Sequence, residues 1–173
     1  MEMQRQEVIY DLLQTERHFV RRLRAMVAAF IVPLRVHASK LWLPGVPTPI
    51  SRLLDWLEDI LNLHMSLLRI LKNVSIAWQE SGVVNEVASG LLSLIPRLEV
   101  HQPYLVRVDE VRGLVVMWVQ DQHSQFGEYI RLREDEGLCD GRSLEQCLQL
   151  PVQRLNAYLV VFKTPGGDTQ ATS

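Results

Sequence analysis

The 173-residue sequence predicts an all-α fold, a bundle of helices joined by short connections. Apolar residues recur at steps of three and four along most of the chain, which is the period of a helix with one buried face. No stretch alternates apolar and polar residues between turn signals, as a half-buried strand would. The sequence also contains no internal repeat. These observations favour one helical bundle over a fold that contains a sheet.

The first long helix is expected over Met1–Leu34, with Pro33 at its end. Its buried stripe consists of Ile9, Leu12, Leu13, Val20, Leu23, Val27, Phe30 and Leu34. Glu16 interrupts this stripe, and a buried unpaired carboxylate is costly in free energy. We therefore expect Glu16 to lie where the stripe reaches the surface. There it either bonds to a neighbour such as Arg17 or is kept for a partner.

Four further helical segments and one turn are expected. The helical segments are Ile50–Trp78, Val83–Leu98, Glu99–Arg133 and Ser143–Lys163, and Asp135–Gly141 reads as the turn. The Pro-rich stretch Arg35–Pro49 cannot continue a helix. Ser143 is expected to cap the last segment, with Glu145 or Gln146 closing a capping box. Pro151 falls inside that segment and is expected to kink it.

Composition and charge exclude several classes of protein. Hydrophobic residues make up 47% of the chain, enough for a core, and the net charge of −2 argues against a nucleic-acid partner. Cys139 and Cys147 lack metal-ligand spacing and are too few for a disulfide scaffold, which favours a reducing cytosolic compartment. The charged N-terminus argues against a cleavable signal peptide, and no window is long and apolar enough to span a bilayer.

Several chemistry-bearing residue types occur without a catalytic pattern. The sequence holds no phosphate-cradling Gly-rich loop, no GxSxG elbow, no HExxH and no CxxC. His64 is the lone histidine on its apolar face, where we expect a core or edge residue with a satisfied ring nitrogen rather than a metal ligand. An enzyme that works through its own side chains is not expected. The sequence instead favours a protein that acts on another protein through a helical surface.

Arginines gather on the polar side of the first expected helix or at its end. They are Arg17, Arg21, Arg22, Arg24 and Arg35. A solvated helix face explains such a run, and a patch for a membrane surface or an acidic partner is the alternative.

Three segments, taken in order, resemble the Dbl homology (DH) domain, the exchange domain of guanine-nucleotide exchange factors for Rho-family GTPases. The opening of this chain, EVIYDLLQTERHFVRRL followed by FIVPL, resembles that family's first conserved region. The segment LLDWLEDILNLHMSLLRIL resembles the helix that follows the first region in the family. The third conserved region resembles SLEQCLQLPVQRLNAYLVVFK. The resemblance covers Arg5 to Lys163 and implies an elongated helical bundle.

The resemblance also implies a function. A chain of this family binds a Rho-family small GTPase, in its nucleotide-free or GDP form, and promotes GDP release by remodelling the switch regions. It needs no cofactor, and it acts in the cytoplasm, with peripheral recruitment to the plasma membrane through other domains. Glu16 matches the glutamate that contacts switch I and pulls it away from the nucleotide. The implied partner-binding residues are Leu12, Glu16, Phe19, Gln153, Arg154, Ala157 and Tyr158. Read without the family, Gln153 and Arg154 form a polar helix face, where Arg154 pairs with Glu145 or Glu16.

The chain departs from the family pattern in its last third. Ala157 stands where the family often has Lys or Arg, and a neutral Ala cannot donate a charge-assisted hydrogen bond. Asn156 replaces a common Pro. The family continues into a further long helix, whereas residues 164–173 are small and polar. We expect them to form a disordered tail after a DH-like domain over residues 1–163, with the C-terminal helix missing or incomplete.

These departures keep two alternatives open. One is a truncated or degenerate DH-fold module that binds a GTPase or a scaffold without catalysing exchange. The other is a structural bundle with no GTPase partner, which a buried, salt-bridged Glu16 would support. A truncated bundle would also leave apolar side chains uncovered and favour self-association, namely around Leu148, Leu155, Leu159 and Phe162.

Overall fold

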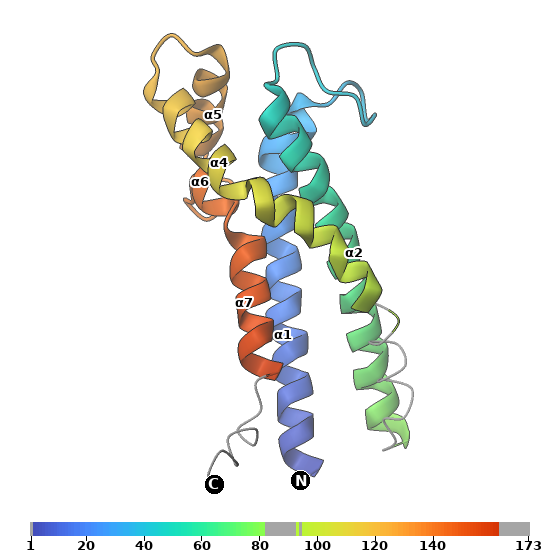
Figure 1. The fold of residues 1–173 in the computed structure, drawn as a ribbon. Coiled ribbons are helices and arrows are strands. Elements are labelled where there is room, and N and C mark those ends of the chain that lie inside the picture. The colour runs from blue at the N-terminus through green and yellow to red at the C-terminus, as the bar shows by residue number, and fades with distance from the viewer. Residues whose placement is uncertain (1, 82–92, 94, 163–173) are drawn as a thin grey trace, which may run out of the picture.

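The computed structural model of the chain describes residues 2–81, 93 and 95–162 (Figure 1). Its elements are α1 (Glu2–Met26), η1 (Val27–Ile31), η2 (Val32–Leu34), α2 (Thr48–Ser81), η3 (Ile95–Val100), α4 (His101–Gln120), α5 (Gln125–Asp135), α6 (Leu144–Cys147) and α7 (Leu150–Phe162). Within these ranges no strand occurs, and one isolated bridge joins Arg35 to Trp42. The predicted all-α class is confirmed.

The molecule is an elongated bundle with α1 at its centre (Figure 1). α2 runs antiparallel to α1 along one side, α7 runs along the other, and α4 crosses both α1 and α2 diagonally. The core fills the space between these helices. Its largest fully buried side chains include Leu23, Met26, Leu53, Leu57, Ile60 and Tyr104. None of the described helices has both the length and the apolar character needed to cross a membrane.

The first helical stretch ends at Leu34, as the sequence predicts, but its last turns are irregular. Val27–Ile31 forms a π-helical turn and Val32–Leu34 a 3₁₀ turn that contains Pro33. Since Pro33 has no backbone N–H, a regular helix at this point would lack one hydrogen bond. The wide turn buries Phe30 and Ile31, and the chain then leaves the helix at Arg35.

The expected single helix over Glu99–Arg133 is wrong. α4 ends at Gln120, and α5 begins at Gln125 and folds back beside α4 (Figure 1). The break has a local cause, because Asp121 accepts a hydrogen bond from the backbone of His123 and Ser124 caps α5. The reversal brings the Phe126 ring edge-on to Trp118. These aromatic side chains pack together, as expected.

The last predicted helix, Ser143–Lys163, is also two helices. The capping box is confirmed, since Ser143 and Gln146 satisfy each other's backbone donors at the start of α6. Pro151 does not kink a continuous helix. It lies in the first turn of α7, where a missing donor is tolerated, and the break precedes it. Leu148 in that break is fully buried beneath Tyr104, whose hydroxyl donates to the Leu148 carbonyl, so its expected exposure is wrong.

Of the remaining expectations, some are confirmed and others concern residues that the structure does not describe. α2 spans the predicted segment Ile50–Trp78, and α5 ends at Asp135 before a turn over residues 136–141. Most of the predicted helix Val83–Leu98 and the whole predicted tail, residues 164–173, lie outside the described residues. The proposed domain limits stay predictions.

Candidate functional site

Glu16 lies in the interface where α1 meets α7. Its side chain has 0% exposure, so the expectation that it lies at the surface is wrong. α7 covers this part of α1, and Arg154 on α7 provides the opposite charge that a buried carboxylate requires. The alternative in which Arg154 pairs with Glu16 is confirmed.

Both oxygens of Glu16 accept hydrogen bonds. Oε2 lies 2.9 Å from Nε and 2.8 Å from Nη2 of Arg154, and it also accepts from the Tyr158 hydroxyl. Oε1 lies 2.6 Å from Nδ1 of His64 on α2. Three helices are therefore joined through one carboxylate. We call the connected side chains the Glu16 cluster, and its members are Glu16, His64, His101, Arg154 and Tyr158.

His101 extends the cluster to the first turn of α4. Its Nε2 lies 2.9 Å from Nε2 of His64, and its Nδ1 lies 3.0 Å from the carbonyl oxygen of Leu98. The carbonyl only accepts, so Nδ1 of His101 carries a hydrogen, and one hydrogen lies between the two Nε2 atoms. Glu16 and His64 share a further hydrogen bond, so a chain of three hydrogen bonds runs from Glu16 to the Leu98 carbonyl.

Burial and the neighbouring charges shift the pKa values of several members of the cluster. Burial raises the pKa of Glu16, but the hydrogen bond and charge of His64, with Tyr158 and Arg154, lower it below its ordinary value overall. Burial, followed by the charge of His64, lowers the pKa of His101. The ionised Glu16 accepts a hydrogen bond from Nδ1 of His64, and the neutral His101 donates from its Nδ1 to the Leu98 carbonyl. Burial raises the pKa of Tyr158, which stays a neutral donor.

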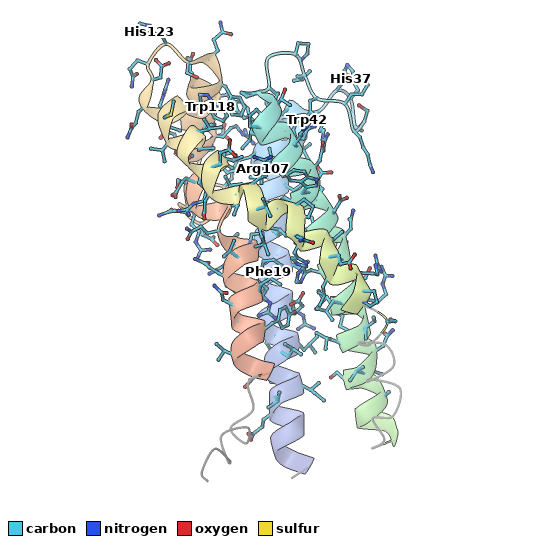
Figure 2. The ribbon with its side chains drawn as sticks, in the orientation of Figure 1. Phe19, His37, Trp42, Arg107, Trp118 and His123 are labelled. Carbon is cyan, nitrogen blue, oxygen red and sulfur yellow. The ribbon has the colours of Figure 1, made fainter. Side chains whose placement is uncertain are left out.

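The other site residues predicted from the sequence differ in exposure. Phe19 is buried and its ring lies edge-on to His64, with the ring centroids 4.7 Å apart. Figure 2 labels Phe19 at the level where α7 runs alongside α1. Leu12 is half-buried, whereas Gln153 and Ala157 are exposed on α7. The structure therefore gathers Phe19 into the interior and leaves Gln153 and Ala157 on the outer side of the helix pair.

His64 and His101 are site residues whose pairing sequence reasoning missed. The core position and satisfied ring of His64 are confirmed, but its partner on α4 could not be deduced because 37 residues separate the two histidines. The only available signal was a pair of histidines on apolar faces of two long helices. Among the described residues, no group of three or more His, Cys, Asp or Glu side chains is arranged to hold a metal ion.

Comparison of the sequence with known proteins identifies the family of this chain. The model of the RhoGEF domain family matches residues 8–171. Protein ECT2 of Mus musculus is 25% identical over 158 residues, which cover 91% of this chain and 17% of that protein. Rho guanine nucleotide exchange factor 12 of Homo sapiens is 27% identical over 171 residues, covering 91% of this chain and 10% of that protein.

A third relative has the same extent of similarity. The FYVE, RhoGEF and PH domain-containing protein 3 of Mus musculus is 24% identical over 159 residues, covering 90% of this chain and 20% of that protein. No solved structure is significantly similar to the chain. This chain thus spans a tenth to a fifth of the length of these relatives. Because the family model matches nearly all of its residues, the chain belongs to the RhoGEF domain family.

Proposed function

We propose that this chain is a guanine-nucleotide exchange domain that binds a Rho-family small GTPase and promotes GDP release by remodelling its switch regions. Membership of the RhoGEF domain family supports an exchange role on a small GTPase. The structural observation that carries the proposal is the pairing of α1 with α7. These helices contain the two segments that resemble the first and third conserved regions, and the ion pair between Glu16 and Arg154 joins them.

The partner surface in this proposal is the outer side of the α1–α7 pair. Gln153 and Ala157 are exposed there, and Leu12 is half-buried. An exchange factor needs no covalent chemistry. It binds the nucleotide-free GTPase more tightly than the GDP-bound form, and by linkage it weakens nucleotide binding by the same factor. Glu16 supports this surface from beneath by fixing Arg154 and Tyr158 of α7 against α1.

The buried ion pair of Glu16 is the outcome that the structural-bundle alternative required, and it also favours a second function. Both of its oxygens already accept hydrogen bonds inside the domain, so contact with switch I would require it to give up Tyr158 or Arg154. Ala157 also offers no charge to a partner. In this second proposal the chain is a RhoGEF-fold module that binds a GTPase or a scaffold without accelerating nucleotide release.

Binding affinity in two nucleotide states separates these functions. Titration calorimetry compares nucleotide-free with GDP-loaded GTPases from a panel of Rho-family members. The exchange proposal expects at least tenfold tighter binding to one nucleotide-free GTPase. Equal affinity for both states would favour the binding module, and absence of binding across the panel would overturn the exchange proposal and leave only a scaffold as the partner of the module.

A surface variant tests the location of the partner face. Ala157→Glu places a charged side chain on the exposed side of α7 and is expected to abolish the binding. Ala28→Glu makes the same change at an exposed position of the first helical stretch. This control is expected to bind as the parent does. Equal loss in both variants would contradict the assignment of the face.

A further inference from the structure

Positive charge is concentrated in one part of the chain. No Asp or Glu occurs between Glu16 and Asp55, although the sequence holds 20 acidic residues. The same stretch carries seven of the 18 Lys and Arg residues. They are Arg17, Arg21, Arg22, Arg24, Arg35, Lys40 and Arg52. A chain whose net charge is −2 therefore contains one strongly basic region.

Part of this charge forms a line along α1. Arg17, Arg21 and Arg24 follow each other at steps of four and three, so they share one side of the helix. Arg21 and Arg24 are exposed and Arg17 is half-buried. Phe19 and Leu23 occupy the buried side of the same helix. We call these three arginines the basic stripe, and the stripe lies away from the α1–α7 face proposed for the GTPase.

The basic stripe has no internal counterions. Within the described part of the chain, none of its three arginines makes an ion pair or a side-chain hydrogen bond, whereas Arg133 and Arg112 pair with carboxylates. The excess of positive charge also affects the nearby His18. Burial lowers the pKa of His18, the charges of Arg22, Arg21 and Arg142 lower it further, and the charge of Asp140 opposes this shift. Unneutralised positive charge on one surface attracts an anionic partner.

An exposed apolar group continues from the end of this helix. Val32 is 59% exposed and Leu41 is 69% exposed, and Leu43 is also exposed. We call Val32, Leu41 and Leu43 the apolar tip. Lys40 is exposed beside it in the loop before α2. Figure 2 shows His37 and Trp42 of this loop at the end of the molecule opposite the start of α1.

The loop that carries Leu41 and Leu43 is tied to α2 by contacts of Arg35 and Trp42 with Asp55. The Arg35 guanidinium lies 3.7 Å from the centroid of the Trp42 ring and 2.7 Å from Asp55 Oδ1. Trp42 Nε1 also donates to Asp55. His37 and Ala38 have φ values of 35° and 56°, in the left-handed region that residues with a Cβ avoid. Such a conformation persists only where surrounding contacts enforce it, and it is common in binding loops.

We propose that the basic stripe and the apolar tip form one surface that binds an anionic lipid membrane. The arginines contact the lipid headgroups, while Leu41 and Val32 enter the boundary between headgroups and acyl chains. Basic residues combined with exposed aliphatic side chains are the chemistry that selects an anionic bilayer surface. An acidic protein segment would satisfy the arginines, but it would not account for the exposed aliphatic side chains at the end of the molecule toward which α1 runs.

This inference does not depend on the proposed exchange function. It concerns a face that excludes α7, so a membrane-bound domain keeps its α1–α7 face open to a GTPase. The chain itself then supplies membrane contact. The two ideas fail in different experiments, since vesicle binding requires no GTPase and nucleotide release requires no vesicles.

Vesicle co-sedimentation tests the surface. The whole chain is mixed with phosphatidylcholine vesicles, or with vesicles that also contain phosphatidylserine. Binding is expected only to the anionic vesicles and is expected to weaken as salt screens the charges. Equal binding to neutral vesicles, or no binding to anionic ones, would overturn the proposal.

Matched variants locate the contact. Arg21→Ala with Arg24→Ala is expected to weaken binding about 25-fold, or about fivefold for each arginine. Arg69→Ala with Arg107→Ala removes the same charge from exposed positions on α2 and α4 and is expected to have little effect. Leu41→Ser is expected to weaken binding while leaving its salt dependence unchanged. Equal losses in the two arginine pairs, or an unaffected Leu41→Ser, would contradict the assigned surface.

Discussion

Glu16 lies fully buried at the meeting point of three helices, and its hydrogen-bond partners lie 48, 138 and 142 residues away in the sequence. The apolar period of the first helix identified it as an exception but could not reveal these partners. A carboxylate on a core stripe has two physical solutions, exposure or pairing, and the choice depends on tertiary contacts. This chain uses pairing. Any role of Glu16 toward a partner is therefore coupled to its role in holding α7 on α1.

Removal of the carboxylate is expected to destabilise the domain. Glu16→Ala leaves Arg154 buried without a counterion, and loss of one member of a buried ion pair costs about 3–5 kcal/mol. Urea unfolding followed by circular dichroism measures the change. Arg154→Leu should cost a similar amount, and the Glu16→Leu, Arg154→Leu double variant should cost less than the sum of the singles. An unchanged unfolding free energy in Glu16→Ala would contradict the buried geometry.

His101 is expected to make the domain sensitive to acid. Its pKa is lowered by burial and by the charge of His64, so the folded state favours a neutral ring. The unfolded chain takes up a proton near the ordinary value of about 6.5, and stability is therefore lost as pH falls from 6.5 toward the folded value. Thermal unfolding at pH 7.5 and 5.5 measures this loss. His101→Phe should show a smaller difference between the two pH values, and an identical difference would refute the assignment.

At the scale of elements, a helix start with a complete local signal was predictable, whereas a helix stop inside a continuing apolar period was not. Ser143 and Gln146 form the expected capping box because the signal lies within four consecutive residues. The break between α4 and α5 was missed because the apolar period continues through it. The stop comes from Asp121 and Ser124, whose side chains compete with the helix for backbone donors.

Two glycines give a matched test of the α4–α5 reversal. A Cβ on Gly127 would lie 1.8 Å from the carbonyl oxygen of Trp118, so Gly127→Ala forces α5 away from α4. A loss of about 1–3 kcal/mol of unfolding free energy is expected from overpacking. Gly113, inside α4, has open space around its Cβ position. Gly113→Ala should stabilise by about 0.5–1 kcal/mol. Equal effects from the two substitutions in chemical denaturation would rule out the close helix approach.

At the scale of the whole molecule, the all-α bundle followed from periodicity, and the family followed from three segments in order. The pairing of α1 with α7 was predicted from the sequence only through the alternative in which Arg154 pairs with Glu16. The contact between His64 and His101 was outside the reach of either argument, because it depends on how α4 crosses α2. The basic stripe was visible in the sequence, whereas its lack of counterions became clear only from the fold.

Release of a fluorescent guanine nucleotide from a panel of Rho-family GTPases, with and without this chain, tests the central proposal most directly. The proposed exchange function predicts faster release from at least one member, and Ala157→Glu should abolish the acceleration while Ala28→Glu preserves it. If the folded chain accelerates release from none of them, the exchange proposal is wrong, and the chain is then a RhoGEF-fold module without exchange activity.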